Sequence, residues 1–277
     1  LRKKVFKNMN ILILGDVCGS AGVKAVTERL PNLISQKKID FTILNGENAA
    51  ENGKGLTKKN TEDFFKAGAD VITTGNHVWD QKEIIEFIET EKRLLRPDNL
   101  TKGSPGKGYG IFQSKNNKKV AVINLMGNVF MRRREDAFKA AKKFIETLRL
   151  KKEADFIIVD MHGEITSEKM AMGYLFDGKV TTIVGTHTHV PTSDHRVMEK
   201  GTAYQTDLGM CGVYESVIGM NRENSLKRFL KDPSGDQHFP ATGEATLCGL
   251  MVVADDKTGL AKKVEPIILG GSLQQRV

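Results

Sequence analysis

The chain has 277 residues, of which 39% are hydrophobic and 27% are charged, and its formal net charge is +8. This composition is ordinary for a globular protein, and a chain of this length can bury one substantial core. No uninterrupted apolar stretch approaches the roughly 20 residues that a membrane span needs, so we expect no membrane partner. The positive charge has two interpretations, a solvated lysine-rich surface or attraction of phosphates and nucleic acid, and charge alone does not choose between them.

The N-terminus and the cysteines bear on where the protein works. Residues 1–8 are basic and are not followed by an apolar signal-peptide region, so we expect them to be an upstream extension or a cloning remnant. We expect residues 9–277 to form a single domain. The three cysteines, Cys18, Cys211 and Cys248, are odd in number and lack CxxC spacing, which argues against disulfides and structural zinc. These features predict a reducing, cytoplasmic location.

Short apolar runs alternate with longer amphipathic segments through the first two-thirds of the chain. This alternation predicts an α/β fold whose near-continuous apolar strands are covered on both faces. The predicted strands are residues 10–14, 40–44, 70–74, 110–113, 119–125, 155–160, 181–184, 196–198, 202–205 and 247–253. The predicted helices are residues 21–37 with an interruption near Pro31, 57–67 with Thr57 as N-cap, 80–89 and 135–150. The economical reading is one domain with a layered mixed sheet.

Potential metal ligands come directly after five of the predicted strands. They are Asp16, Glu47 and Asn48, Asn76, His162, and the pair His187 and His189. In layered α/β folds, functional sites form where the carboxyl ends of strands meet their loops. Each signal alone could be a turn or a surface histidine, but five such segments together favour one site. If residues 187–189 are extended, both imidazoles of that pair face the same way.

The chemistry of these side chains favours a pair of transition-metal ions. Mixed imidazole, carboxylate and amide-oxygen ligands suit iron, manganese or zinc better than calcium. Seven ligands exceed what one tetrahedral ion requires, and they fit two ions about 3.5–4 Å apart with one bridging carboxylate. Such a pair polarises a phosphoryl oxygen and activates water near neutral pH. The sequence therefore predicts phosphoester chemistry.

The order of these motifs resembles the calcineurin-like metallophosphoesterase superfamily, and within it the YmdB-like branch of bacterial cyclic-nucleotide phosphodiesterases. The supporting stretches are GDVCGSAG, NGENAAENGKGLT, TTGNHVWD, RPDNL, NLMGNVFM, GTHTHVPTSD and TDLGMCGVYESVIGM. The resemblance runs from about Met9 to the C-terminus. It implies an α/β/β/α sandwich with mixed sheets and a homo-oligomer. It also implies hydrolysis of 2′,3′-cyclic nucleotides, and of 3′,5′-cyclic nucleotides as a second class, by attack of a metal-bound hydroxide.

The resemblance also implies a role for each residue of the site. One metal would be held by Asp16, Glu47, Asn48 and His189, and the other by Glu47, Asn76, His162 and His187, with Glu47 bridging. His77 resembles the family's phosphate-contacting general acid.

Two departures from the wider superfamily affect the choice of metal. The first strand is followed by Asp16-Val17-Cys18 instead of Asp-x-His, and Glu47 stands where an aspartate usually bridges. An amide oxygen from Asn48 in place of an imidazole favours iron or manganese over zinc. We expect Cys18 to be a small buried thiol and not a ligand.

Other functions remain open at this point. The same metal pair would serve a phosphomonoesterase, such as a nucleotidase or a protein phosphatase. A regulatory RNA- or protein-binding module with a mainly structural metal site is a different class, which the basic charge suggests. Three adjacent arginines, Arg132–Arg134, are either a solvated loop or a contact for phosphate or RNA. There is no aromatic RNA-binding motif, and aromatic residues make up only 6% of the chain.

Overall fold

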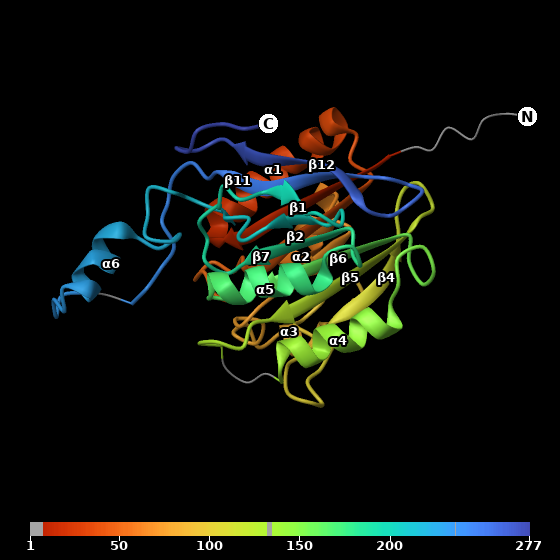
Figure 1. The fold of residues 1–277 in the computed structure, drawn as a ribbon. Helices are drawn as coiled ribbons and strands as arrows, with labels where there is room; N and C mark the ends of the chain where they lie inside the picture. The colour runs from red at the N-terminus through yellow and green to blue at the C-terminus, as the bar shows by residue number, and fades with distance from the viewer. Residues whose placement is uncertain (1–7, 132–134, 236) are drawn as a thin grey trace, which may run out of the picture.

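The computed structural model describes residues 8–131, 135–235 and 237–277 (Figure 1). The helices are α1 (Gly19–Lys37), α2 (Lys58–Ala67), α3 (Ile84–Phe87), α4 (Ala137–Thr147), α5 (Thr166–Phe176) and α6 (Arg222–Phe229). The strands are β1 (Met9–Cys18), β2 (Phe41–Asn48), β3 (Val71–Thr73), β4 (Tyr109–Gln113), β5 (Lys119–Met126), β6 (Phe156–His162), β7 (Thr182–Thr186), β8 (Arg196–Val197), β9 (Ala203–Gln205), β10 (Met210–Cys211), β11 (Leu247–Ala254) and β12 (Ala261–Leu269). Within the described ranges, no helix is both long enough and apolar enough to cross a bilayer.

The strands form two mixed sheets. The first has the order β12-β11-β1-β2-β3, with β10 also paired to β1, and the second has the order β4-β5-β6-β7-β9-β8. The strands β1, β2 and β3 run parallel, as do β5, β6, β7 and β9, while β11, β12, β4 and β8 pair antiparallel with their neighbours. The predicted hairpin of β4 and β5 is confirmed.

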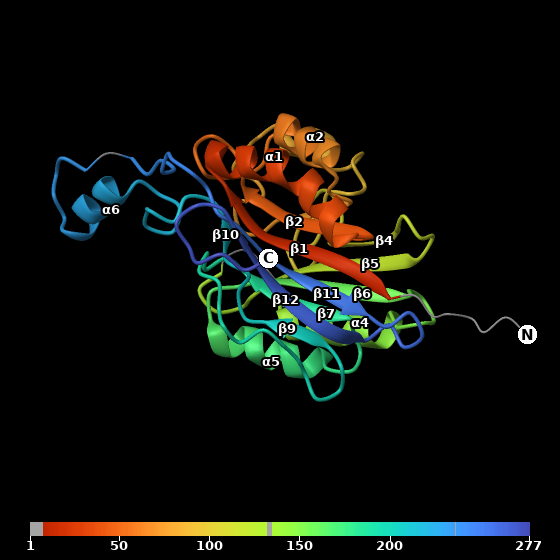
Figure 2. The ribbon, with the colours of Figure 1, turned by 90° about the horizontal axis from the view of Figure 1, so that it is seen from above.

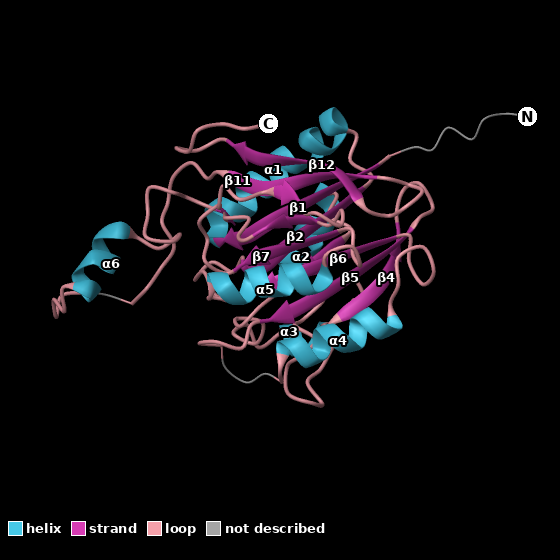
Figure 3. Ribbon diagram, in the orientation of Figure 1, coloured by secondary structure: helices cyan, strands magenta, loops and turns pink. Residues whose placement is uncertain are grey.

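Strand periodicity explains how the sheets become layered. On β1, Leu12 and Leu14 pack in the cluster that contains the buried face of α1, while Ile11 and Ile13 pack in the cluster shared with β5 and β6. Alternate side chains of a strand point to opposite faces, so each sheet can bury both faces. Figure 2 shows α1 and α2 outside the first sheet and α4 and α5 outside the second, and Figure 3 shows the strands between these helices. The predicted α/β/β/α sandwich with mixed sheets is confirmed.

Some predicted element boundaries were wrong. Helix α1 runs without interruption through Pro31. The proline removes one backbone donor, but the buried side chains of Val26, Leu30 and Leu33 hold the helix against the sheet. The predicted helix over 80–89 shortens to α3, since the residues before it form the turns after β3. The helix predicted over 135–150 is α4, whose N-cap Asp136 accepts a hydrogen bond from the Lys139 amide. Thr57 caps α2 as predicted.

Four elements had no counterpart in the prediction: α5, α6, β10 and β12. Of the predicted N-terminal extension, residues 1–7 lie outside the described part of the chain. All three cysteines are free and buried, although burial was predicted only for Cys18.

Candidate metal centre

The carboxyl ends of β1, β2, β3, β6 and β7 meet at one edge of the sandwich, where the two sheets face each other. Asp16 lies near the end of β1, and Glu47 and Asn48 end β2. His162 is the last residue of β6. Asp16, Glu47 and His162 are at most 1% exposed. The strand pattern therefore brings polar side chains that are distant in sequence to one buried place.

Three of the predicted ligands surround one nitrogen atom of a fourth, His162. His162 Nε2 lies 3.0 Å from Glu47 Oε1, 3.1 Å from Asn76 Oδ1 and 3.1 Å from His187 Nδ1. Ligand atoms of Glu47, His162 and His187 all lie within 4.8 Å of one another, a spacing that could hold a metal ion. These contacts join the first sheet, through Glu47 and Asn76, to the second.

The other three predicted ligands adjoin this group. His189 Nε2 lies 3.2 Å from Asn48 Oδ1. The backbone amide of His187 donates to Asp16 Oδ2 over 3.0 Å, and Asp16 Oδ1 lies 3.7 Å from His162 Nδ1. Asp16 thus contacts the first group, and the His189–Asn48 pair lies next to it in the chain, beside His187 and Glu47.

Two observations test whether a cation fits here. Asp16 Oδ1 is buried and has no hydrogen-bond partner, which is costly for a carboxylate oxygen unless a positive group faces it. At Gly75, a Cβ atom would collide with His162 Nε2 and Glu47 Oε2, so the missing side chain leaves the space beside these two ligand atoms open. Carboxylate, imidazole and amide donors around such a space fit a transition-metal ion.

The three histidines have their second ring nitrogens engaged outside the centre. The hydroxyl of Thr186 has one proton, which it donates to Asp160 Oδ1 over 2.7 Å. It must therefore accept the hydrogen bond from His162 Nδ1, at 2.9 Å, and His162 Nε2 faces the cluster. His189 Nδ1 donates to the carbonyl oxygen of Ile218 over 2.8 Å. Such outer hydrogen bonds fix the tautomer and ring orientation of ligating histidines.

His187 also has one ring nitrogen bound outside the centre, but here the outer nitrogen is Nε2 and the inner one is Nδ1. Its Nε2 lies 3.0 Å from Glu164 Oε2, which leaves Nδ1 directed to the cluster. Asp160, which supports His162 through Thr186, also accepts from Thr73 and Asn45. Neither Asp160 nor Glu164 was predicted from the sequence, because outer partners carry no motif of their own.

Burial and the neighbouring charges shift the pKa values of the cluster. Burial raises the pKa of Asp16 to about 6. Burial would also raise the pKa of Glu47, but the charge of His162 and their hydrogen bond lower it, and Glu47 in turn raises the pKa of His162. Burial and the neighbouring His162 lower the pKa of His187 to about 3. These opposite shifts show that the acidic and imidazole side chains interact strongly with one another.

The geometry of the His187–His189 pair differs from the sequence argument. Strand β7 ends at Thr186, and His187 and His189 have positive φ angles of 99° and 65°. The segment is therefore not extended, and the condition under which both imidazoles would face one way is not met. The two rings reach the same cluster through a strained turn, which is a common feature of functional sites.

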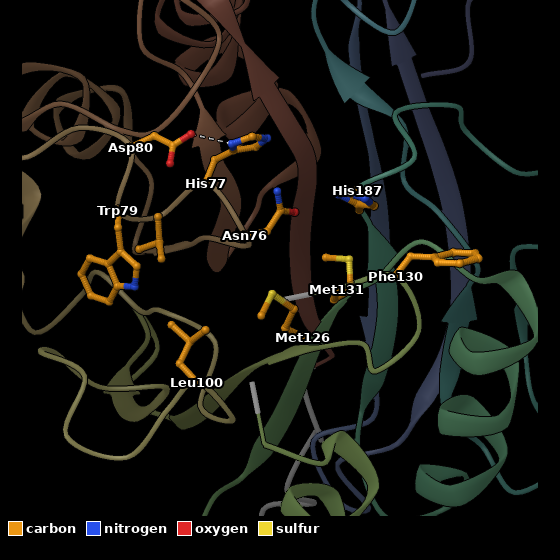
Figure 4. A pocket seen from close by; sticks show the side chains of 10 residues that line it. Asn76, His77, Trp79, Asp80, Leu100, Met126, Phe130, Met131 and His187 are labelled. Carbon is orange, nitrogen blue, oxygen red and sulfur yellow. Dashed lines mark hydrogen bonds and ion pairs between the residues drawn. The ribbon is translucent and has the colours of Figure 1, made fainter. Parts of the chain in front are cut away.

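His77 lies beside the cluster and is held by two contacts. Its backbone amide donates to Glu47 Oε2 over 3.1 Å, and its Nδ1 lies 2.8 Å from Asp80 Oδ2 (Figure 4). The second ring nitrogen, Nε2, is not used in this pair. Asp80 was not predicted as a functional residue, although the His-x-x-Asp spacing in a turn after a strand is a signal that could have found it.

Two other sequence predictions concern this region. Cys18 is buried, and burial raises its pKa to about 12, so it is a neutral thiol as expected. The segment Arg132–Arg134 lies outside the described residues, so its predicted phosphate or RNA contact remains a prediction.

The fold and the site together define the class. The α/β/β/α sandwich, with carboxylate, amide and imidazole side chains gathered at its strand ends, is the metallophosphoesterase fold. The YmdB-like protein family matches residues 12–267. The chain belongs to this family, as its motifs indicated.

Three bacterial proteins are similar to this chain. A Bacillus subtilis protein named 2′,3′-cyclic-nucleotide 2′-phosphodiesterase is 46% identical over 261 residues, which cover 94% of this chain and 97% of that protein. The crystal structure of a Mycoplasma pneumoniae protein described as a novel phosphatase has a TM-score of 0.88 at 38% identity, covering 96% of this chain and 95% of the other. A crystal structure of a hypothetical protein from Thermus thermophilus has a TM-score of 0.86 at 37% identity, covering 95% and 100%.

Proposed function

We propose that this protein hydrolyses 2′,3′-cyclic nucleotides to nucleoside 3′-phosphates. The observation that carries the proposal is the convergence of Glu47, His162 and His187 around one space, with His77 beside it. The Bacillus subtilis relative, 46% identical, is named for this reaction. In the reaction, water adds to phosphorus, the bond from phosphorus to the 2′ oxygen breaks, and that oxygen leaves with a proton.

We propose two metal ions in this centre, with iron or manganese as the native metals. One would be held by Asp16, Glu47, Asn48 and His189, and the other by Glu47, Asn76, His162 and His187, with Glu47 shared. When bound, such ions supply Lewis-acid stabilisation of the phosphoryl charge and lower the pKa of water. The protein contributes ligand orientation, through the outer hydrogen bonds of its histidines.

His77 is the proposed general acid. Asp80 holds its Nδ1, so Nε2 is directed away from that pair and can give a proton to the departing 2′ oxygen. The amide contact from His77 to Glu47 ties the position of this acid to the centre. The imidazole also lines the pocket that opens beside the centre.

A substrate panel tests the proposed function. The protein, loaded with Mn²⁺, is offered 2′,3′-cyclic AMP, 3′,5′-cyclic AMP, 3′-AMP and p-nitrophenyl phosphate, and the products are separated by chromatography. We expect 2′,3′-cyclic AMP to react fastest and to give only 3′-AMP, with 3′,5′-cyclic AMP as the second substrate. Faster turnover of the monoesters would instead support the phosphomonoesterase alternative.

Metal binding is expected to stabilise the fold. A ligand that binds only the native state at about a hundred times its dissociation constant raises the free energy of unfolding by about 2.7 kcal/mol. We expect Mn²⁺ to do this in urea denaturation of protein treated with a chelator. His162→Ala should remove the Mn²⁺ effect, whereas His238→Ala, remote from the cluster, should keep it. An equal effect of Mn²⁺ on native protein and His162→Ala would contradict the ligand assignment.

Removing the partner of the proposed acid is expected to slow the reaction. Asp80→Asn should lower kcat for 2′,3′-cyclic AMP by about tenfold to a hundredfold, because the imidazole loses the carboxylate that orients it. For bis-p-nitrophenyl phosphate, whose leaving group needs no proton, the loss should be much smaller. Glu86→Gln, an exposed change on α3, is the matched control. Equal losses on both substrates would rule out a role in leaving-group protonation.

We propose a homo-oligomer whose contact includes α6. Figures 1 and 2 show this helix standing away from the sandwich. The helix and the residue that follows it carry three large apolar side chains, Leu226, Phe229 and Leu230, which are 57%, 78% and 70% exposed. Large apolar side chains exposed together mark contact surfaces. We expect light scattering to give a mass above that of one chain, and Phe229→Asp with Leu230→Asp to return it to one chain.

Two further proposals concern the domain organisation and the cellular environment. We propose that residues 9–277 act as a single domain, since the sheets share a continuous buried cluster. We also propose a reducing, cytoplasmic environment, which the three unpaired buried cysteines support. No observation among the described residues favours the RNA-binding alternative.

A further inference from the structure

A pocket of about 450 Å³ opens directly beside the candidate metal centre. One side is polar and belongs to the site already described, through Asn76, His77 and His187. Figure 4 shows these side chains along one side of the pocket. A group that fills this pocket can therefore be attached to a phosphate held at the centre.

The other side of the pocket is apolar and well packed. Its floor is formed by Val78, Leu100, Met126 and Met131, each of which is at most 7% exposed. Buried side chains of this kind form a preformed surface and need no reordering when a ligand binds. Thioether sulfurs also make favourable contacts with aromatic rings of varied shape.

Two aromatic side chains complete the lining. Figure 4 places Trp79 and Phe130 at opposite ends, with Leu100 and Met126 between them. Phe130 is 81% exposed and has a φ of 62°, in the left-handed region. Exposure gains nothing for folding, and a bulky residue is disfavoured at this φ. Folding therefore does not account for a phenylalanine at this position, whereas contact with a ligand does.

The pocket's size and charge restrict what it can accept. Ligand pockets commonly measure about 300–1,000 Å³, so 450 Å³ suits a group much larger than phosphate. Among the lining residues that the structure describes, Asp80 is the charged one apart from the histidines, and it is already paired with His77. The described apolar floor favours an uncharged group, and the aromatic ends favour a flat ring.

We propose that this pocket is the nucleobase subsite of the enzyme, with Phe130 and Trp79 as stacking surfaces. This inference rests on the proposed function and specifies which part of the substrate confers affinity. Because stacking uses the face of a base and not its edge, the subsite tolerates different bases. Purines, with the larger face, should bind more tightly than pyrimidines.

The chain supplies its own probe, because Trp79 is its single tryptophan. We would titrate Mn²⁺-loaded protein with 3′-AMP and with ribose 3-phosphate, which lacks the base, and follow tryptophan fluorescence. We expect 3′-AMP to shift the emission and to bind at least about tenfold more tightly than ribose 3-phosphate. Dibutyl phosphate, an apolar diester without a ring, should bind as weakly as ribose 3-phosphate.

Variants then locate the contact. Phe130→Ala should weaken 3′-AMP binding by about tenfold or more and raise KM for 2′,3′-cyclic AMP, while kcat changes little. Its effect on ribose 3-phosphate binding should be much smaller. Phe130→Tyr should restore the affinity, because it restores the ring. Tyr174→Ala, an exposed aromatic on α5 that does not line the pocket, should leave all values unchanged.

Several results would overturn the subsite. These are equal affinity for 3′-AMP and ribose 3-phosphate, tight binding of dibutyl phosphate, or equal behaviour of Phe130→Ala and Tyr174→Ala. If cyclic nucleotides are hydrolysed at rates that do not depend on the base, the subsite is wrong and the proposed function is still supported. If binding depends on the base but no cyclic nucleotide is hydrolysed, the subsite is supported and the proposed function is wrong.

Discussion

Glu47→Gln is expected to lower kcat/KM for 2′,3′-cyclic AMP by roughly a thousandfold. Glu47 is the carboxylate that touches both His162 Nε2 and the amide of His77, and it is the proposed bridge between two metal ions. The amide keeps the shape but removes the charge. Charge stabilisation of several kcal/mol is then lost, and each loss of about 1.4 kcal/mol costs a factor of ten in rate.

The measurement pairs steady-state kinetics with elemental analysis of the purified variant. We expect less than the native amount of bound metal together with the loss of rate. Glu51→Gln is the matched control, because Glu51 is an exposed glutamate in the loop after β2. A Glu47→Gln enzyme that keeps its metal and reacts within tenfold of the native rate would exclude the bridging role.

The second large effect is expected at a buried ion pair under the His187–His189 turn. Lys169 Nζ lies 2.8 Å from Asp207 Oδ2, and both side chains are at most 2% exposed. Asp207 also accepts from the backbone amide and the hydroxyl of Thr188, over 3.0 and 2.7 Å. The ion pair therefore fixes the residue that stands between the two histidines.

Breaking this pair from one side should be strongly destabilising. Lys169→Met leaves the Asp207 carboxylate buried without its cation, which typically costs about 3–5 kcal/mol. We expect a loss of this size in urea denaturation, accompanied by about tenfold to a hundredfold weaker metal binding, because the histidine turn is held less firmly.

Two further variants make this result specific. The double variant Lys169→Met with Asp207→Asn should recover part of the stability, since no unpaired charge then remains buried. Lys179→Met, at an exposed position after α5, should change stability little. If Lys169→Met were no more destabilising than Lys179→Met, the ion pair would have no structural role.

The sequence was most informative where several signals agreed. The gathering of Asp16, Glu47, Asn76, His162 and His187 could be predicted because each lies at or just after the end of an apolar strand. Parallel strands bring their carboxyl ends to one edge. The same apolar runs predicted both layers of strands. In these segments the local apolar pattern and the observed position in the sheets agree.

Prediction failed where a tertiary contact overrides the local pattern. Helix α5 was missed because its buried face includes Glu168 and Lys169, which read as solvent-facing residues in a hydrophobic pattern. Glu168 is used to accept from the backbone amides of Asn128 and Val129. Polar groups buried with their partners cannot be recognised before the partners are known.

Supporting residues were missed for a related reason. Asp160 and Asp207 act through hydrogen bonds to residues 26 and 19 positions away, with Thr186 and Thr188 as the partners. Nothing local in the sequence connects these residues. The nucleobase pocket likewise combines side chains from the segment after β3 with others from the end of β5 and beyond, so its shape exists only in the folded protein.

The placement of the ligands on two sheets has a consequence for how the protein is made. Asp16 and Asn48 come from the first sheet, and their partners His187 and His189 follow them by 171 and 141 residues. A ribosome-bound chain that ends before β7 lacks His187 and His189, which are two of the seven proposed ligands. On the proposed ligand assignment, the complete metal centre therefore forms only late in biosynthesis, when the turn at residues 187–189 joins the first strand.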